Sequence, residues 1–377
     1  MNFCSSFRSL QSSTAAQRRS YGVVVLSLLF APLLFAQVGD NNPSGASGIF
    51  NGQAGACGYD PYTGNASRSI TDIIVSGAVG EYPLALVRTA NSRAPSATEV
   101  FGWAGGWNHN YNWRMADSAR SGVQNFAPTS YTVDFPDGRV ETFKSVTWDT
   151  TCYRVRATNG GNASSAGVRE RLQPHGVAGG YAYLLLPDGG KVQFQAEQRR
   201  DGVGQYYYRY TATAIIDPYD LSTTLIWDTT GNTKRLRWVI EPSGLRNLHF
   251  DYVNSGPRIA SVTASDGRVV QYNYIYCSDC FLDNVVYYGN PNWTARYKYC
   301  NSNIGYPDIN PSLLWTCDDP MYPGPMKRIA YEYKPAGTNW DNHQVVYGQL
   351  FRERYWDGTP GHESSGVMVS QLSLIHI

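Results

Sequence analysis

Short runs of alternating apolar and polar residues, separated by turn sequences, recur between residues 215 and 276. The repeated unit occupies residues 217–228 and 241–252, and a looser copy occupies residues 265–274. Each copy begins with residues such as Asp-Pro or Ser-Asp-Gly, which favour tight turns. The alternating runs are rich in β-branched and aromatic residues, as is typical of half-buried strands. The repetition predicts a row of antiparallel hairpins, each packed on its neighbours.

Aromatic positions in this row predict which side chains enter the core. Strand alternation places Phe250 and Tyr252 on one face and Asp251 on the other. We expect Phe250 and Tyr272 to be buried. The pairs expected to occupy equivalent places in neighbouring units are Tyr252 with Tyr274 and, in looser register, Trp238 with Ile259.

The same pattern extends beyond the row. Two further hairpins, at 135–143 and 186–194, share a Pro-Asp-Gly sequence that suits a type I turn. Residues 156–180 lie between these hairpins, and their polar, Gly-rich composition predicts a long loop. A composition with 28 Tyr, 37 Gly and 20 Pro also suits strands and turns. We predict an all-β fold of successive antiparallel hairpins, with little helix beyond the amino-terminal segment.

The amino-terminal segment has the pattern of a secretory signal. Arginines at 8, 18 and 19 precede an apolar run at 23–35, and Ala36 offers a small residue for cleavage. A retained membrane anchor is the alternative, although the run is short for a span and contains Pro32. We expect a signal peptide at 1–36 and a flexible lead-in at 37–57, and hence a protein secreted or held in the cell envelope.

Cysteine usage agrees with export. Six of the seven cysteines follow the signal segment, and an even number in an exported chain favours disulfides. They are Cys57, Cys152, Cys277, Cys280, Cys300 and Cys317. At least one disulfide is expected among the last four. A zinc site is the alternative, because Cys277 and Cys280 form a C-x-x-C pair, but a second pair is missing from the sequence.

Residues 101–114 are strongly aromatic, with Trp103, Trp107, Tyr111 and Trp113. We expect a buried aromatic cluster, since Trp is usually highly buried; an exposed ligand platform is the alternative. His109 has no Ser, Cys or carboxylate near it in a catalytic pattern, which favours a hydrogen-bonded structural histidine.

Charge and carboxylate placement argue against several function classes. Charged residues make up 16% of the chain and the net charge is +1, unlike the basic patches of nucleic-acid binders. Asp137, Asp188 and Asp266 stand in turns, where local hydrogen bonds account for them. We therefore expect no catalytic, cofactor-binding or metal-binding residues, no cofactor, and no enzyme activity.

Several segments resemble the RHS/YD-repeat family. Residues 80–92 are similar to the family's lead-in, with Ala90 in place of the usual aromatic, and 101–111 are similar to its Trp-x-His-x-Tyr segment. The repeat signatures stand at Arg235-Leu236, Arg258-Ile259, Phe250-Asp251-Tyr252 and Tyr272-Asn273-Tyr274. The resemblance covers about residues 58–335. It implies a β-ribbon that spirals into a hollow shell, which in several relatives encloses a carboxy-terminal toxin and in others serves adhesion. The family's self-cleavage motif is not found.

The resemblance divides the chain into an RHS-type β region at 58–205 and a YD-repeat region at 206–335, with a Cys-rich insertion at about 300–325. Residues 336–377 are expected to be a partial repeat with an artefactual end at 372–377. The expected function is a non-catalytic scaffold within an exported shell. The alternatives are a cell-surface carbohydrate- or partner-binding module and, third, a glycoside-active enzyme. Expected partners are the missing carboxy-terminal region or an enclosed effector, or a surface glycan or protein, and no nucleic acid.

Overall fold

In the computed structural model, every regular element of the described residues is a β-strand. The described residues are 58–60, 65–91, 99–102, 106–117, 119–146, 149–155, 170–176, 179–230, 233–254, 256–275, 281–288, 294–299, 314–318, 328–333, 350–356 and 367–371. Within them, no helix is long and apolar enough to cross a membrane. The expected signal segment, the lead-in at 37–57 and the chain end at 372–377 lie outside this part. The predicted all-β fold of antiparallel hairpins is confirmed.

The first four strands form an antiparallel sheet in chain order. They are β1 (Gly58–Asp60), β2 (Asn65–Ile74), β3 (Ala85–Asn91) and β4 (Asn108–His109). The β2–β3 pairing shifts register between Thr71 and Ile73, which leaves Asp72 as the extra residue of a bulge. Bulges re-aim side chains. Residues of β3 are buried on both of its faces, so the strand is covered from two sides.

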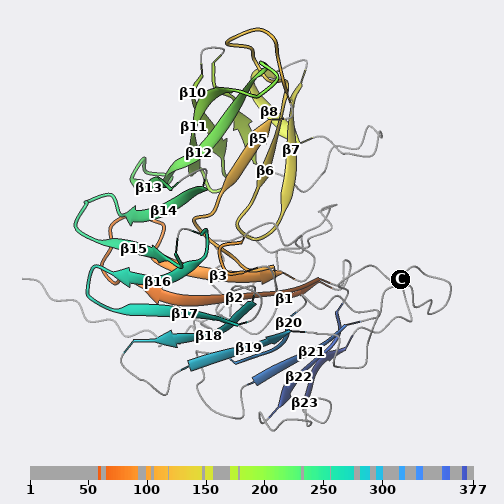
Figure 1. The fold of residues 1–377 in the computed structure, drawn as a ribbon, viewed down its shortest axis with the longest axis vertical. Coiled ribbons are helices and arrows are strands. Elements are labelled where there is room, and N and C mark those ends of the chain that lie inside the picture. Colours follow the sequence, from red (N-terminus) through yellow and green to blue (C-terminus); the bar gives the residue numbers. More distant parts are fainter. Residues whose placement is uncertain are drawn as a thin grey trace, which may run out of the picture. The chain divides into compact units, whose positions relative to one another are not determined.

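The remaining strands form one ladder in which each strand pairs antiparallel with the next along the chain (Figure 1). They are β5 (Arg114–Asp117), β6 (Ser130–Asp134), β7 (Val140–Val146), β8 (Asp149–Val155), β9 (Arg171–Gln173), β10 (Gly180–Leu185), β11 (Lys191–Arg200), β12 (Tyr206–Ile216), β13 (Ser222–Thr230), β14 (Thr233–Ile240), β15 (Asn247–Tyr252), β16 (Ile259–Ala264), β17 (Val269–Ile275), β18 (Phe281–Tyr287), β19 (Thr294–Tyr299), β20 (Leu314–Asp318), β21 (Arg328–Tyr333), β22 (Leu350–Trp356) and β23 (Val367–Gln371). One extra pairing sets Arg209 of β12 opposite Ala116 of β5. β12 thus changes neighbour along one edge, from β5 to β13.

One turn design recurs between these strands. The N–H of the fourth turn residue donates to the carbonyl of the first, and the fourth residue has a positive φ. Residues in that fourth position include Gly138, Gly189, Gly204, Asp220, Gly244 and Gly267. This is a type I turn followed by a left-handed residue, a common hairpin connection. The type I turns predicted for the two Pro-Asp-Gly sequences are confirmed.

Replacing Gly267 with alanine is expected to cost about 1–2 kcal/mol, because an L-residue is strained in the left-handed region. The φ of Gly267 is 87°, and an added Cβ would meet no atom within 4 Å, so backbone strain alone is tested. Urea unfolding measures the loss. The matched control is Gly202→Ala, at a position that is equally open but has no positive φ. Equal effects of the two substitutions would contradict the strain argument.

A second recurring feature lies in the second half of β13, β15, β17 and β19. In each strand, a register shift against the following strand immediately precedes an aromatic residue that donates to a carbonyl of the preceding strand. The bonds are Trp227 Nε1 to Ala212 O (2.6 Å), Tyr252 Oη to Leu236 O (2.7 Å), Tyr274 Oη to Ile259 O (2.6 Å) and Tyr299 Oη to Leu282 O (2.9 Å). The predicted equivalence of Tyr252 and Tyr274 is confirmed, and the unit recurs more often than the sequence indicated.

The aromatic side chains that were predicted to be buried lie in the core. Phe250 and Tyr272 are 0% and 3% exposed, as predicted. The prediction that Trp238 and Ile259 occupy equivalent places in neighbouring units is wrong. Leu236 is the counterpart of Ile259, since both are buried and both carbonyls accept a tyrosine hydroxyl. Trp238 is 36% exposed and stacks on His249, with ring centroids 4.1 Å apart.

Two segments expected to be irregular contribute strands. The interval 156–180 contains β9, which pairs with β8 and β10. The interval 300–325, expected as an insertion, contains β20, which continues the ladder between β19 and β21. The described side chains include none of the cysteines, so the predicted disulfide lies outside them.

Candidate functional site

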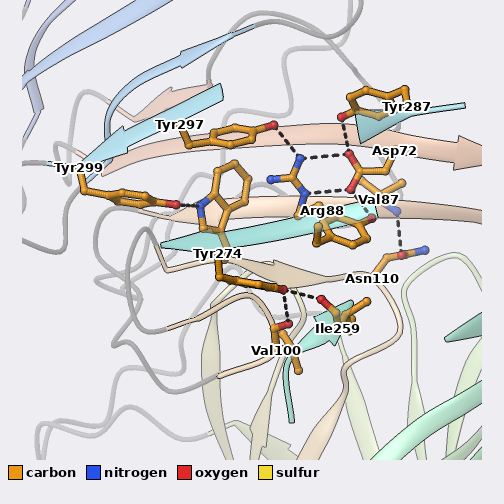
Figure 2. A network of polar contacts seen from close by, with 12 residues as sticks. Asp72, Val87, Arg88, Val100, Asn110, Ile259, Tyr274, Tyr287, Tyr297 and Tyr299 are labelled. Carbon is orange, nitrogen blue, oxygen red and sulfur yellow. Dashed lines mark hydrogen bonds and ion pairs between the residues drawn. The ribbon is translucent and has the colours of Figure 1, made fainter. Parts of the chain in front are cut away.

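A buried polar network lies where the β2–β3 hairpin meets the repeat strands (Figure 2). Its centre is the pair of Asp72, the bulge residue of β2, and Arg88 of β3, whose side chains are both 0% exposed. Arg88 Nε lies 2.8 Å from Asp72 Oδ2, and Arg88 Nη2 lies 3.1 Å from Oδ1. Such a two-pronged pair compensates for lost hydration only when further hydrogen bonds satisfy the remaining polar groups.

Three tyrosines from successive strands supply further bonds to both Asp72 oxygens and to Arg88 Nη2. Tyr272 of β17 and Tyr287 of β18 each donate to a different Asp72 oxygen, both at 2.8 Å. Arg88 Nη2 donates to Tyr297 Oη of β19 at 2.7 Å. Burial and the Asp72 carboxylate raise the pKa of Tyr272 and Tyr287 well above 10, so both remain neutral donors. Burial opposes the charge on Arg88, but Asp72 outweighs it and holds the pKa of Arg88 well above its ordinary value.

Aromatic rings enclose the same guanidinium. The Arg88 Cζ atom lies 4.3 Å from the Trp107 ring centroid and 4.9 Å from that of Tyr297, within cation–π range. Trp107 Nε1 donates to Tyr299 Oη at 3.0 Å. The buried members of the aromatic segment are Phe101, Trp107, Tyr111 and Trp113, all 3% exposed or less. The predicted buried cluster is confirmed for these residues, and Trp103 lies outside the described part.

His109 belongs to this core. It is 2% exposed, and its ring centroid lies 5.7 Å from that of Phe250. Its Nδ1 accepts the N–H of Tyr111 at 3.3 Å. Burial, and then the charge of Arg114, lower the pKa of His109 to about 3, so the ring is neutral. The geometry is that of the structural histidine expected from the sequence.

The loop that joins β2 to β3 runs along the row of turns. We name residues 74–82 the clasp loop. The loop runs antiparallel to the order of the turns: its last residues contact the earliest turn, and its first residue contacts the latest turn. The contacts are Tyr82 Oη to Asp188 Oδ2 (2.7 Å), Glu81 N to Asp217 Oδ2 (2.9 Å), Val79 N to Glu241 Oε2 (2.9 Å) and Arg268 Nη2 to Ile74 O (2.5 Å). The clasp loop therefore ties four consecutive hairpins at their turns.

The turn carboxylates Asp137, Asp188 and Asp266 each accept the backbone N–H two residues later, as the turn interpretation predicts. Asp217 and Glu241 have a second role that sequence reasoning missed. Each accepts backbone N–H groups of its own turn and one from the clasp loop. Burial alone would raise the pKa of Glu241, but the Ser243 hydroxyl and these N–H groups lower it to about 2.

We expect the clasp loop to loosen in acid. A carboxylate with a lowered folded-state pKa contributes stability that is present above its ordinary pKa and lost as the pH falls through the folded value. For Glu241 that window runs from 4.5 down to about 2. Glu241→Gln should cost about 1–3 kcal/mol at pH 7, and its difference from the unmodified chain should vanish near pH 2. Urea unfolding of both chains across this range measures the difference. A difference that stays constant with pH would contradict the role of the charge.

A second feature is a cleft of about 600 Å³ between β5, β6 and β12 to β15. It lies at the fork where β12 changes neighbour. Its charged lining residues are Glu99, Arg114, Asp134, Arg209, Lys234 and Arg235. Sequence reasoning did not bring them together, because they come from five separate segments.

No group of three or more His, Cys, Asp or Glu in the described part could hold a metal ion. The Asp72–Arg88 pair is sealed from solvent, and its partners are protein groups. The fold and contacts define a β-strand repeat protein in which an amino-terminal hairpin is fastened to the repeats.

Comparisons with known proteins add little to this description. No protein-family model matches the sequence, and no curated protein matches it. A chain in the structure of the Photorhabdus luminescens Tc holotoxin pore is similar, with a TM-score of 0.34 and 16% sequence identity. The match covers 83% of the present chain and 16% of that chain. At this level of similarity the match assigns neither a family nor a function.

Proposed function

We propose that the chain is the amino-terminal, non-catalytic part of an RHS/YD-repeat scaffold, whose β-shell holds a downstream region or an effector. The observation that carries this proposal is the recurring bulge and aromatic-to-carbonyl bond at Trp227, Tyr252, Tyr274 and Tyr299. Tyr252 and Tyr274 stand at the end of the two repeat signatures, and Tyr299 ends a similar Tyr-Lys-Tyr run. Contacts between neighbouring units are what a repeat protein requires.

The two fastening devices also favour a scaffold. Asp72 and Arg88 are the kind of charged groups that an active site would expose, yet they are fully buried and bonded to tyrosines. The clasp loop holds successive hairpins at a fixed spacing. Both features resist deformation of the ribbon. In keeping with the signal-like start, we place the protein outside the cell or in the cell envelope.

The proposal predicts an encoded region downstream of this chain, and the test is to express that region together with the chain. A scaffold that encloses a downstream region should protect that region from protease, whereas the same region expressed alone should be cut rapidly. Equal cleavage rates in the two contexts would overturn the proposal. Hydrolysis of a glycan by the purified chain, abolished by a single carboxylate substitution, would overturn its non-catalytic part.

A further inference from the structure

Three polar side chains meet where β12 lies beside β5. The Nε2 atom of His175, two residues beyond the end of β9, lies 2.9 Å from the Tyr210 hydroxyl of β12. The same hydroxyl lies 3.0 Å from Oδ2 of Asp117, the last residue of β5. At the other side of the imidazole, His175 Nδ1 lies 2.6 Å from the Gly176 carbonyl oxygen. We name Asp117, Tyr210 and His175 the seam network.

Few backbone bonds hold the seam that this network crosses. Among the described residues, the β5–β12 pairing consists of Arg209 opposite Ala116. Beyond the end of β5, Ser121 and Tyr206 form one further antiparallel bridge. The seam network links both strands to the segment that follows β9, so its hydrogen bonds reinforce a junction that the backbone pairs only sparsely.

The seam network is removed from solvent. The Asp117 side chain is 0% exposed, and His175 and Tyr210 are 4% and 9% exposed. In such a place, a contact between two polar atoms that lacks its hydrogen leaves a group unsatisfied, and this destabilises the folded state.

Aromatic rings and one cation surround the network. The ring centroid of His175 lies 4.3 Å from that of Tyr208 on β12 and 6.2 Å from that of Tyr131 on β6. Arg120 Nη1 lies 3.9 Å from Asp117 Oδ1, but the arginine side chain is 46% exposed. A half-exposed cation at this distance gives the Asp117 carboxylate only weak compensation for its lost hydration.

The contacts of the network restrict where its hydrogens lie. A carbonyl oxygen only accepts, so His175 Nδ1 carries a proton and donates to Gly176. If Tyr210 donates to an ionised Asp117, the contact between Tyr210 Oη and Nε2 of a neutral imidazole has no hydrogen. If Asp117 is protonated, it donates to Tyr210, Tyr210 donates to Nε2, and every contact has one hydrogen.

We propose that Asp117 carries the proton that completes this network, and that the seam is a latch that loosens as the pH rises and the proton leaves to solvent. Every member of the complete network is uncharged, as burial favours. Burial raises the pKa of Asp117 and lowers the pKa of His175. The latch is therefore complete below the raised pKa of Asp117 and above the lowered pKa of His175.

Replacing Asp117 with asparagine tests the latch, because the amide keeps a hydrogen for Tyr210 at every pH. A carboxyl with a raised folded-state pKa contributes stability that is present below its ordinary pKa, here 3.8, and lost as the pH rises through the folded value. In urea unfolding from about pH 4 to about pH 8, Asp117→Asn should gain stability relative to the unmodified protein. The gain should be about tenfold in the unfolding equilibrium constant per pH unit, and should stop above the folded pKa.

The matched control is Asp201→Asn in the β11–β12 turn, where the carboxylate accepts the N–H groups of Val203 and Gln205. This variant should show no gain as the pH rises. A gain confined to Asp117→Asn supports the latch, whereas no gain in Asp117→Asn, or an equal gain in both variants, would overturn it.

Nuclear magnetic resonance of the unmodified protein gives a second measurement that does not depend on a folded variant. The carboxyl carbon of Asp117 should titrate above 3.8, and the ring nitrogens of His175 should show a neutral imidazole with its proton on Nδ1. A carboxyl signal that titrates at or below 3.8, or a charged His175 at neutral pH, would overturn the proposal. Neither measurement depends on the proposed scaffold function, which protease protection tests separately.

Discussion

Replacing Arg88 with alanine should destabilise the folded chain by about 3–5 kcal/mol, the range for removing one partner of a buried ion pair. The substitution leaves the Asp72 carboxylate at 0% exposure without its counter-charge. It also removes the donor to Tyr297 and empties space beside the Trp107 ring. Urea unfolding followed by tryptophan fluorescence measures the change, and the slope of the transition shows whether it stays two-state.

A double-mutant cycle separates the pair from general damage to the core. Asp72→Asn and Arg88→Met are combined, and we expect the double variant to lose clearly less than the sum of the single variants. Arg199→Ala is the matched surface control, because its ion pair with Glu197 is 47% exposed on both sides and should contribute at most about 1 kcal/mol. An additive cycle, or an Arg88→Ala loss as small as the surface control, would show that the pair does not fasten the hairpin.

Local sequence patterns predict those parts of the fold that local forces determine. Alternation and turn residues specify strands and type I turns, because side-chain period and φ preference act within a few residues. Burial of Phe250 and Tyr272 follows from the same alternation. The bulges opposite Tyr252 and Tyr274 do not, since the extra residues, Ala260 of β16 and Asp283 of β18, change the pairing without changing the pattern of β15 and β17.

Hydrogen bonds between residues far apart in the chain are harder to predict from the sequence. Asp72 bonds to tyrosines 200 and 215 residues away, and no spacing rule connects such positions. The available hint was a single charged residue in β3, Arg88, and the acidic residue Asp72 next to two isoleucines in β2. Asp217 and Glu241 were explained by their turns, which concealed their bonds to the clasp loop. The cleft was missed because it arises only where β12 changes neighbour.

Truncating Phe250 to alanine is the second substitution with a large expected effect, a loss of about 3–5 kcal/mol. The Phe250 ring is 0% exposed and packs near the His109 ring of β4, so it contributes to the contact between the first sheet and the repeats. Its removal leaves a cavity that the paired strands β14 and β16 cannot close without shifting the ladder. Chemical denaturation gives the free energy, and hydrogen exchange shows whether β4 loses protection together with β15.

Two neighbouring substitutions act as matched controls. Asp251→Ala removes a side chain that is 47% exposed and lies 3.7 Å from Arg237, and it should cost less than about 1 kcal/mol. Phe250→Leu keeps most of the apolar volume and should lose clearly less than alanine. If burial of the ring determines the losses in stability, Phe250→Ala loses most, Phe250→Leu loses less, and Asp251→Ala loses least. If Phe250→Ala and Asp251→Ala cost the same, Phe250 does not contribute to the core in the way its position indicates.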